Sequence, residues 1–469
     1  MVAAKKSRGT AKKKTPRSRV GKSSLLSSRL SGKSLFIAAA LVVVVGALVV
    51  WFAVAATAPQ MEPETWNKNE NRVAGNMNGC VETLDNQTAS GGKYIQFGCS
   101  TMPTDMDHTT MNCTPGIGVM SAMGPCINNT LIPAAKAGLA RANIQSVTPI
   151  RLSPPTTWNS GQGEPGAFRS RCDFSHMNYD DAVLYYGQPG KAHLHTYFGN
   201  TGTNASSTSA SLLNSGSSTC AGGTFNRSAY WIPTMIDTAT GRPIAPNDDR
   251  GVYNSDLEIY YKVGYQGVGY NDVKPFPNGL QMIAGNQASA TSEPQRARNG
   301  KYPVKYYCEG AATADRTRNN EGLGIPVCAA GQVLVMDVDF PQCWDGVNLR
   351  AANGRSHIEY GRWHNGSTVP PGITPISESA GCPPSHPVPM PHIEMFVRWR
   401  VPSGADTRNW RLSSDNYTTG PGGYSGHADY IFAWDATAFP TIVNRCYVAQ
   451  QDCGYQIGDG RYPVPLRGY

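Results

Sequence analysis

The stretch HIEMFVRWR, residues 392–400, has the alternation that decides the predicted fold. Ile393, Met395, Val397 and Trp399 would share one side of an extended chain, because successive side chains of a β-strand point to opposite faces. Glu394 and the arginines would lie on the other side. This pattern is typical of a half-buried antiparallel strand.

Similar short runs recur on both sides of this stretch, between residues that favour turns. They are DAVLYYG (181–187), AHLHTYFG (192–199), SAYWIPTMI (228–236), LEIYYKVGY (257–265), LQMIAG (280–285), KYPVKYYC (301–308), QVLVMDVDF (332–340) and YIFAWD (430–435). The 50 glycines and 34 prolines suit many short strands better than long helices. We see no glycine-rich nucleotide loop, long amphipathic helix or internal repeat. Residues 169–455 are therefore predicted to form an all-β, antiparallel sandwich or jelly-roll-like domain with long loops.

Positive charge is concentrated at the N-terminus. Residues 1–34 contain eleven of the 41 basic residues and no acidic residue, so the remainder carries 30 basic and 33 acidic groups, a net charge of −3. We expect a disordered basic tail over 1–34, and the folded part shows no basic excess for binding nucleic acid.

A stretch of 24 uncharged residues, LFIAAALVVVVGALVVWFAVAATA (35–58), follows the tail. At about 1.5 Å per residue, a helix of this length covers a hydrocarbon core of about 30 Å. The basic flank places the N-terminus in the cytoplasm. A cleaved signal peptide is the alternative, with Ala53-Val54-Ala55 as its cleavage signal, but its charged and apolar regions would both be unusually long. We expect a retained signal anchor, a stalk over 59–79 and an exported remainder.

All twelve cysteines lie beyond the apolar stretch, and none belongs to a CxxC motif. This usage favours disulfides in an oxidising compartment over zinc ribbons or thioredoxin-type sites. Plausible local pairs are Cys446–Cys453, Cys308–Cys328 and Cys113–Cys126, although spacing alone does not decide the connectivity. Residues 80–168 are predicted to be a cysteine-containing extension and linker with one helix at about 133–143, and 456–469 a C-terminal tail.

The segment KAHLHTYFGN, residues 191–200, places two histidines one residue apart. If the segment is a strand, His193 and His195 share a face about 6–7 Å apart and could hold one metal ion or flank one substrate group. An ordinary structural role for both is an equal alternative.

Other histidines are accompanied by acidic residues. The motifs are RCDFSHMNYDD (171–181), SHIEYG (356–361), CPPSHPVPMPHIEM (382–395) and YSGHADY (424–430). A neighbouring carboxylate orients a histidine that acts as a metal ligand or a general base, although such pairs also tie loops together. The predicted catalytic set is His193, His195, His176, Asp181, His427 and Asp429, with His193 and His195 as ligands if a divalent metal is bound. A histidine, or a water held by the metal, would then transfer the proton.

The ordered series of motifs resembles the DUF1996 family of exported proteins, over about residues 169–446. The resemblance implies an extracytoplasmic domain of unknown function, and some relatives carry modules thought to bind cell-wall glycans. Positions matching the family's polar motifs that we predict to bind substrate are Asn200, Asn226, Tyr230, Trp231, Trp344 and His357. One departure is DAVLYYGQPG (181–190), which lacks the proline that usually follows the aspartate.

Three functions follow as hypotheses. The first is a membrane-anchored, extracytoplasmic domain that acts on or binds a cell-envelope polysaccharide through the His/Asp site. The 22 tyrosines and nine tryptophans support it, because aromatic rings stack on sugars, although core packing is their commoner role. The second is a non-catalytic glycan-binding or structural surface protein. The third is a histidine-ligated divalent-metal protein.

Overall fold

The computed structural model describes residues 120–121, 124–148, 165–248, 255–264, 268–287, 302–310, 320–321, 324–361, 381–417 and 419–466. The predicted tail (1–34), membrane span (35–58) and stalk (59–79) lie outside the described residues. Among the residues that are described, no helix has the length and apolar character needed to cross a membrane.

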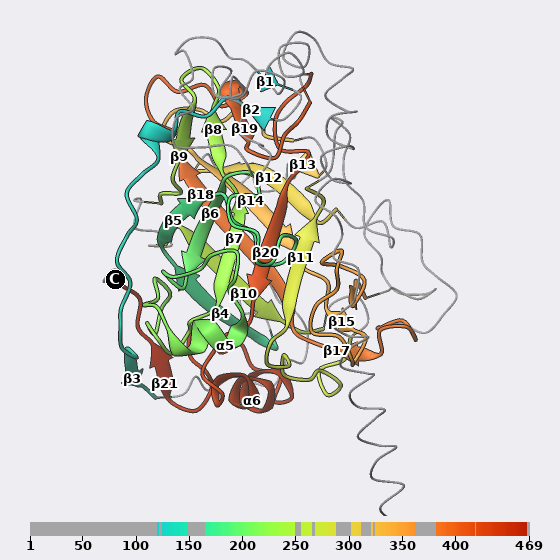
Figure 1. The fold of residues 1–469 in the computed structure, drawn as a ribbon. Coiled ribbons are helices and arrows are strands. Elements are labelled where there is room, and N and C mark those ends of the chain that lie inside the picture. Colours follow the sequence, from blue (N-terminus) through green and yellow to red (C-terminus); the bar gives the residue numbers. More distant parts are fainter. Residues whose placement is uncertain are drawn as a thin grey trace, which may run out of the picture. The chain divides into compact units, whose positions relative to one another are not determined.

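Two antiparallel sheets dominate the structure (Figure 1). The six-stranded sheet has the order β13 (Asn320–Glu321), β12 (Val304–Glu309), β14 (Val333–Asp339), β18 (His392–Arg400), β10 (Leu257–Lys262) and β4 (Ala167–Cys172). The five-stranded sheet has the order β11 (Gln281–Gly285), β20 (His427–Ile431), β7 (Ala229–Pro233), β6 (His195–Gly199) and β5 (Phe174–Asn178). An all-β, antiparallel domain was predicted, and the structure is mainly β, with antiparallel sheets and few helices.

The other elements are short. Small sheets are formed by β1 (Met120–Ser121) with β2 (Gly124–Pro125), by β16 (Ile358–Glu359), β15 (Cys343–Trp344) and β17 (Val388–Pro389), by β19 (Trp410–Leu412), β8 (Met235–Asp237) and β9 (Arg242–Ile244), and by β21 (Arg461–Pro463) with β3 (Ile144–Ser146). The described helices are η2 (Asn129–Leu131), α5 (Ser209–Asn214), η4 (Thr407–Asn409), α6 (Ala438–Ile442) and the π-helical η5 (Val443–Tyr447).

The main core takes side chains from both large sheets. On β18, which lies between β14 and β10, the four apolar residues Ile393, Met395, Val397 and Trp399 are all buried in it, as their alternation predicts. Tyr230 of β7 and other residues of the five-stranded sheet belong to the same cluster. Each sheet therefore turns one face to this core, and its opposite face carries both polar side chains and a smaller apolar cluster.

The predicted helix at 133–143 is wrong. This segment contains no helix, and the backbone of Leu139 exchanges two hydrogen bonds with that of Ser218, at 2.8 and 3.1 Å. At Gly138 an added Cβ would lie 2.4 Å from the carbonyl carbon of Ser218. Helix propensities of a few tenths of a kcal/mol per residue are overridden by this pairing.

Both ends of the described chain join the β-domain. Strand β3 lies in the predicted extension over 80–168, and it pairs with β21 in the predicted tail over 456–469. Strand β4 begins at Ala167, just before the predicted boundary at residue 169.

Disulfide bonds stabilise the domain at several places. The described bonds are Cys172–Cys220, Cys308–Cys328, Cys343–Cys382 and Cys446–Cys453. Two of the three predicted local pairs are confirmed. Cys126 is also disulfide-bonded, while Cys113 lies outside the described residues.

Gly199, the last residue of β6, provides a test of the packing. Its φ is +83°, and an added Cβ would lie 2.1 Å from the carbonyl oxygen of Ser228. Gly331 has the same φ of +83°, but an added Cβ there would meet no atom within 4 Å. We expect Gly331→Ala to cost only about 1–2 kcal/mol of backbone strain, and Gly199→Ala to cost about 1–3 kcal/mol more because of overpacking. Urea unfolding of both variants measures the difference, and equal losses would contradict the close approach at Gly199.

Candidate functional site

The candidate site lies on the face of the five-stranded sheet that points away from the main core. On β20, Ala428 and Tyr430 belong to the main core, so His427 and Asp429 point to the opposite face. On β6, the core residue is Phe198, and His195 shares the outer face with Tyr197. Strand β7 lies between β6 and β20 and pairs with both. Two histidine-bearing strands that are far apart in sequence are thus held on the same face.

Three histidines converge on this face. The ring centroid of His193, which lies just before β6, is 4.3 Å from that of His195 and 5.0 Å from that of His427. One ring nitrogen from each histidine can be chosen so that all three lie within 4.8 Å of one another. One ligand atom each of Asp181, His195 and Asp429 meets the same criterion. The two groups share His195.

Backbone carbonyls determine which ring nitrogens carry protons. His195 Nδ1 lies 2.9 Å from the carbonyl oxygen of Asp180, and His427 Nδ1 lies 2.9 Å from that of Ser425. A carbonyl oxygen can only accept, so both Nδ1 atoms donate. Burial lowers the pKa of His195 to about 3 and that of His427 well below its usual value, so both rings are neutral near pH 7. Both Nε2 atoms therefore present lone pairs.

These two lone pairs belong to atoms that approach each other. His195 Nε2 and His427 Nε2 are 3.4 Å apart. Two unprotonated nitrogens cannot hydrogen-bond to each other, but they can share a cation. In a tetrahedral zinc site with Zn–N bonds of 2.0–2.1 Å, two nitrogen ligands lie about 3.3–3.4 Å apart. The observed separation matches that spacing.

Further buried polar atoms beside this pair have no hydrogen-bond partner in the described structure. They are Nε2 of His193 and both carboxylate oxygens of Asp429. Asp429 Oδ2 lies 3.9 Å from His427 Nε2. Burial, and secondarily the charge of Asp181, raise the pKa of Asp429 well above its usual value. Leaving such groups unpaired is unfavourable, and together they are side chains that could hold a cation.

Residues 181–194, which we call the strap, cover this face of the sheet. Ala182 and Val183 pack with Tyr197 and Trp231 in a second apolar cluster. The strap begins at Asp181, whose Oδ1 accepts hydrogen bonds from the backbone N–H groups of Val183 and Leu184, at 2.7 and 3.0 Å. Burial raises the pKa of Asp181 to about 6. We call the five residues of the two ligand groups the cluster: His193, His195, His427, Asp181 and Asp429. Of these, only His193 is partly exposed.

Arg355 is a site residue that the sequence analysis missed. Its charge acts on Asp429 and Asp181 and holds the pKa of both below what burial alone would give. The guanidinium donates to Gly285 O and to Gln287 Oε1. The only sequence signal was its position next to the motif SHIEYG.

The sixth predicted catalytic residue, His176, lies apart from the cluster. Its ring stacks on that of Tyr197 with centroids 4.7 Å apart, and its Nε2 is 3.0 Å from Thr203 O. Its Nδ1 is 2.9 Å from Ser175 Oγ. Both ring nitrogens are thus engaged, and His176 is in neither group of potential ligands.

The residues predicted to bind substrate are dispersed. Asn200, Asn226, Tyr230 and Trp231 are fully buried. Asn200 donates to Leu212 O and Ser215 O, and Tyr230 shares a hydrogen bond with Tyr261 in the core. Trp231 packs with Tyr197 on the outer face of the sheet, and we do not include these four positions in the site proposed below.

Trp344 and His357 lie on or next to the small sheet formed by β15, β16 and β17. Trp344 Nε1 donates to Asn348 O at 2.6 Å. His357 Nε2 is 2.7 Å from Gln281 O. Both therefore have internal partners.

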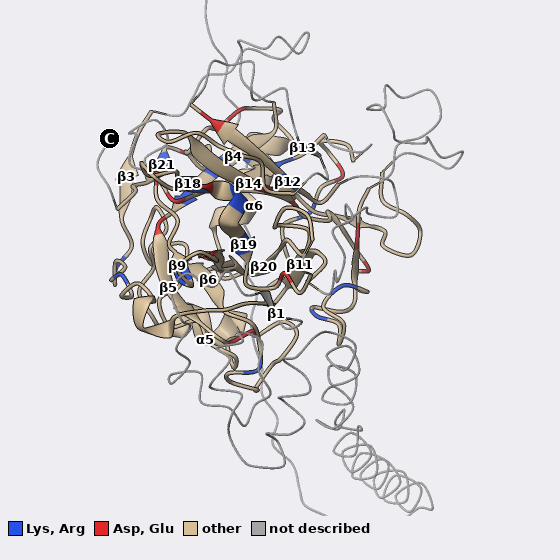
Figure 2. Ribbon diagram, turned by 90° about the horizontal axis from the view of Figure 1, so that it is seen from above, with Lys and Arg blue, Asp and Glu red and all other residues tan. Residues whose placement is uncertain are grey.

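A second cluster of ionisable groups lies on the outer face of the six-stranded sheet. Lys305 Nζ is 3.0 Å from Asp337, 2.9 Å from Asp339 and 3.9 Å from Glu394. One oxygen from each of the three carboxylates lies within 4.8 Å of the others, and Figure 2 marks acidic and basic positions in red and blue. Lys305 already supplies the cation here, so this cluster is an internal ion-pair network.

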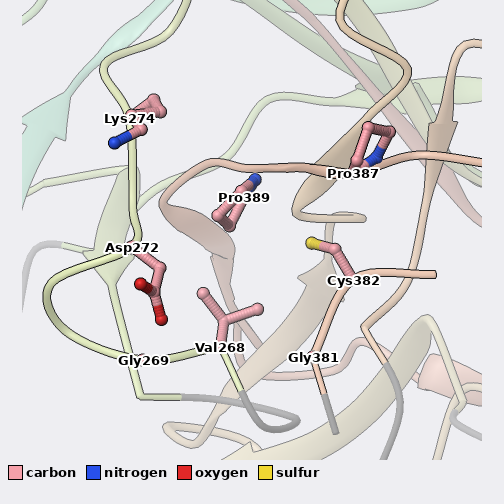
Figure 3. Close-up of a pocket in the computed structure, with 8 residues that line it drawn as sticks. All are labelled: Val268, Gly269, Asp272, Lys274, Gly381, Cys382, Pro387 and Pro389. Atoms are coloured by element: carbon pink, nitrogen blue, oxygen red, sulfur yellow. The ribbon is translucent and has the colours of Figure 1, made fainter. Parts of the chain in front are cut away.

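One described pocket, with a volume of about 400 Å³, is separate from the histidines. Asp272, Lys274 and Cys382 are among its lining residues (Figure 3). Its wall carries one acidic and one basic side chain and no histidine, so it does not extend the candidate site.

The buried histidines predict a pH dependence in the presence of a chelator. The folded-state pKa of His195, about 3, lies below the usual 6.5. The unfolded chain therefore binds more protons between these values, so the contribution of His195 to stability is complete above about pH 6.5 and is lost as the pH falls toward 3. The loss is at most about 1.4 kcal/mol per pH unit. The raised pKa of Asp181 acts in the opposite sense.

The measurement is urea unfolding at several pH values for wild type and for His195→Gln. The difference between their unfolding free energies gives the contribution of His195 at each pH. The variant should lose less stability on acidification. Parallel curves would show that His195 is not buried as a neutral ring.

Comparison with known protein families gives one match. A family model described as "Domain of unknown function (DUF1996)" matches residues 181–434. No curated protein and no solved structure shows a significant match to the chain.

Proposed function

Since the chain belongs to the DUF1996 family, whose description names no activity, we propose a function from the geometry: the domain binds one divalent metal ion through His193, His195 and His427. The observation that carries the proposal is the 3.4 Å contact between the Nε2 atoms of His195 and His427, both with Nδ1 engaged by a carbonyl. Histidine ligands of metals commonly have their second nitrogen fixed in this way.

A proton shared by the two imidazoles is the alternative occupant of the contact. It would require one ring to be protonated, whereas burial and the neighbouring histidine lower the pKa of His427. A metal also explains the unpartnered Nε2 of His193, which a proton between the other two rings leaves unexplained. We therefore favour the metal.

Nitrogen ligands at tetrahedral spacing suit Zn²⁺, and imidazole also binds Cu²⁺ and Ni²⁺. Asp429 would lie beside the ion, where its charge lowers the cost of holding a cation in a buried place. Three histidine ligands leave a fourth position for water or another ligand, as in zinc sites that perform chemistry.

Location and substrate complete the proposal. We propose that the β-domain is exported and joined to the membrane through residues 35–58, and the disulfide bonds support an oxidising compartment. We also propose that its two sheets form a jelly-roll-like sandwich. A cell-envelope polysaccharide remains the substrate hypothesis from the sequence.

Metal analysis of the purified full-length chain tests the metal proposal. We expect close to one equivalent of a transition metal per chain after dialysis, lost on treatment with a chelator and restored by Zn²⁺ in a calorimetric titration. The thermal midpoint should rise with metal, because an ion bound only by the folded state stabilises it. A chain that contains no metal and binds none in the titration would refute the proposal.

A further inference from the structure

Arg355 lies next to the strand that bears His427, because its guanidinium donates to the carbonyl oxygen of Gly285, the β11 residue paired with His427 of β20. Its side chain is only partly buried, and its charge acts on Asp429, Asp181 and His427. Among the described residues it forms no ion pair within 4 Å with either carboxylate, and Asp429 accepts no hydrogen bond from it. A guanidinium has five N–H donors, and the two described hydrogen bonds go to Gly285 O and Gln287 Oε1. Donors therefore remain for a further oxygen.

The loop that carries Arg355 packs against the strap. At Gly354, which has a φ of +67°, an added Cβ would lie 2.9 Å from Leu184 Cδ2 and 3.2 Å from Val183 Cγ1. On the same loop, the guanidinium of Arg350 lies 4.6 Å from the ring centroid of Tyr186, which is 41% exposed. The loop thus contacts the strap both at Tyr186, which is exposed, and at Val183 and Leu184, next to Gly354.

The charges of the site depend on the metal. A divalent ion adds two positive charges next to Asp181, Asp429 and Arg355. Even with both aspartates ionised, these groups and the ion sum to +1, so the loaded site attracts an anion. Arginine binds carboxylate and phosphate groups through paired hydrogen bonds.

Building on the proposed function, we propose that the loaded site binds an anionic ligand, a carboxylate or a phosphate group. One of its oxygens takes the fourth position on the metal, and Arg355 donates to another. Metal and anion then bind cooperatively, and each raises the affinity for the other by the same factor.

The test is a calorimetric titration of the full-length, Zn²⁺-loaded chain with acetate and, separately, with methyl phosphate. Arg355→Met is the variant, and Arg350→Met is its matched control on the same loop. We expect at least one anion to bind the loaded wild type, with a Kd about tenfold or more higher in Arg355→Met and unchanged in Arg350→Met. The chelated protein should bind neither anion, and the arm that binds identifies the group.

Binding of neither anion to the loaded chain would overturn the inference, as would equal affinity in Arg355→Met. Equal binding with and without metal would overturn the cooperative site. Failure of the metal proposal itself is a different result, because the chain would then take up no Zn²⁺ in the preceding titration. Metal content of Arg355→Met should match wild type, which shows that the variant has folded with its histidines in place.

Discussion

His195→Ala is expected to weaken divalent-metal binding by more than about a hundredfold. Removal of an outer partner of a metal ligand already costs about ten- to a hundredfold, and His195 is itself the residue shared by both groups of potential ligands. Its Nε2 forms the 3.4 Å contact with His427. Without it, only His193 and His427 remain as histidine ligands. Metal content by mass spectrometry and calorimetric titration with Zn²⁺ measure the effect.

His386→Ala is the matched control for His195→Ala. His386 is half-buried, hydrogen-bonded to Ser356 O at 3.2 Å, and outside the cluster. It should leave metal content unchanged. His193→Gln removes a ligand at the partly exposed edge and provides a second variant if His195→Ala fails to fold. Stoichiometric, tight metal binding by both site variants would show that the ligands have been wrongly assigned.

Lys305→Met is expected to destabilise the domain by about 3–5 kcal/mol. Removing one partner of a buried ion pair leaves an uncompensated charge, and Lys305 serves three carboxylates at once. Asp337 and Asp339 are almost fully buried. Burial already raises the pKa of Asp337 to about 8, against the opposing charge of Lys305. The measurement is the free energy of unfolding in urea at about pH 7.

The same carboxyl groups determine how the stability of Lys305→Met changes with pH. Without Lys305 the carboxyl groups have still higher pKa values in the folded state, so the folded variant binds more protons than the unfolded chain. Its stability should then fall further as the pH rises. Arg408→Met, which removes an exposed partner of Asp406, should not change stability measurably. An equal, small effect in both variants would show that the Lys305 network contributes nothing.

Local pattern predicted the parts of this protein that depend on local chemistry. The alternation in HIEMFVRWR placed four apolar residues on one face, and all four are in the core. Short loops predicted the disulfides Cys308–Cys328 and Cys446–Cys453. The alanine-rich segment 133–143 was wrongly predicted to be a helix. Its intrinsic helix preference is weak, and its backbone pairs with a distant segment at Ser218.

The candidate site could be predicted only in part. The spacing of two histidines pointed to His193 and His195, and the His–acid motifs to His427, Asp181 and Asp429, which the structure places close together. The same motifs also pointed to His176, whose nitrogens are engaged elsewhere. The aromatic positions Tyr230 and Trp231 proved to be buried, because a motif shows that a residue type recurs and not whether it faces solvent. Arg355 carried almost no signal, since it is distant in sequence from every histidine of the cluster.

The sequence by itself determined which faces of the strands are apolar, because side-chain direction alternates with a period of two whatever the surroundings. It also determined which histidines and carboxylates are available to form a site. Only the tertiary structure decided that the Nε2 atoms of His195 and His427 meet at 3.4 Å. That contact depends on the order β20–β7–β6 in the sheet and on two backbone carbonyls that orient the rings. Contacts between residues 232 positions apart depend on long-range packing, to which no local pattern is sensitive.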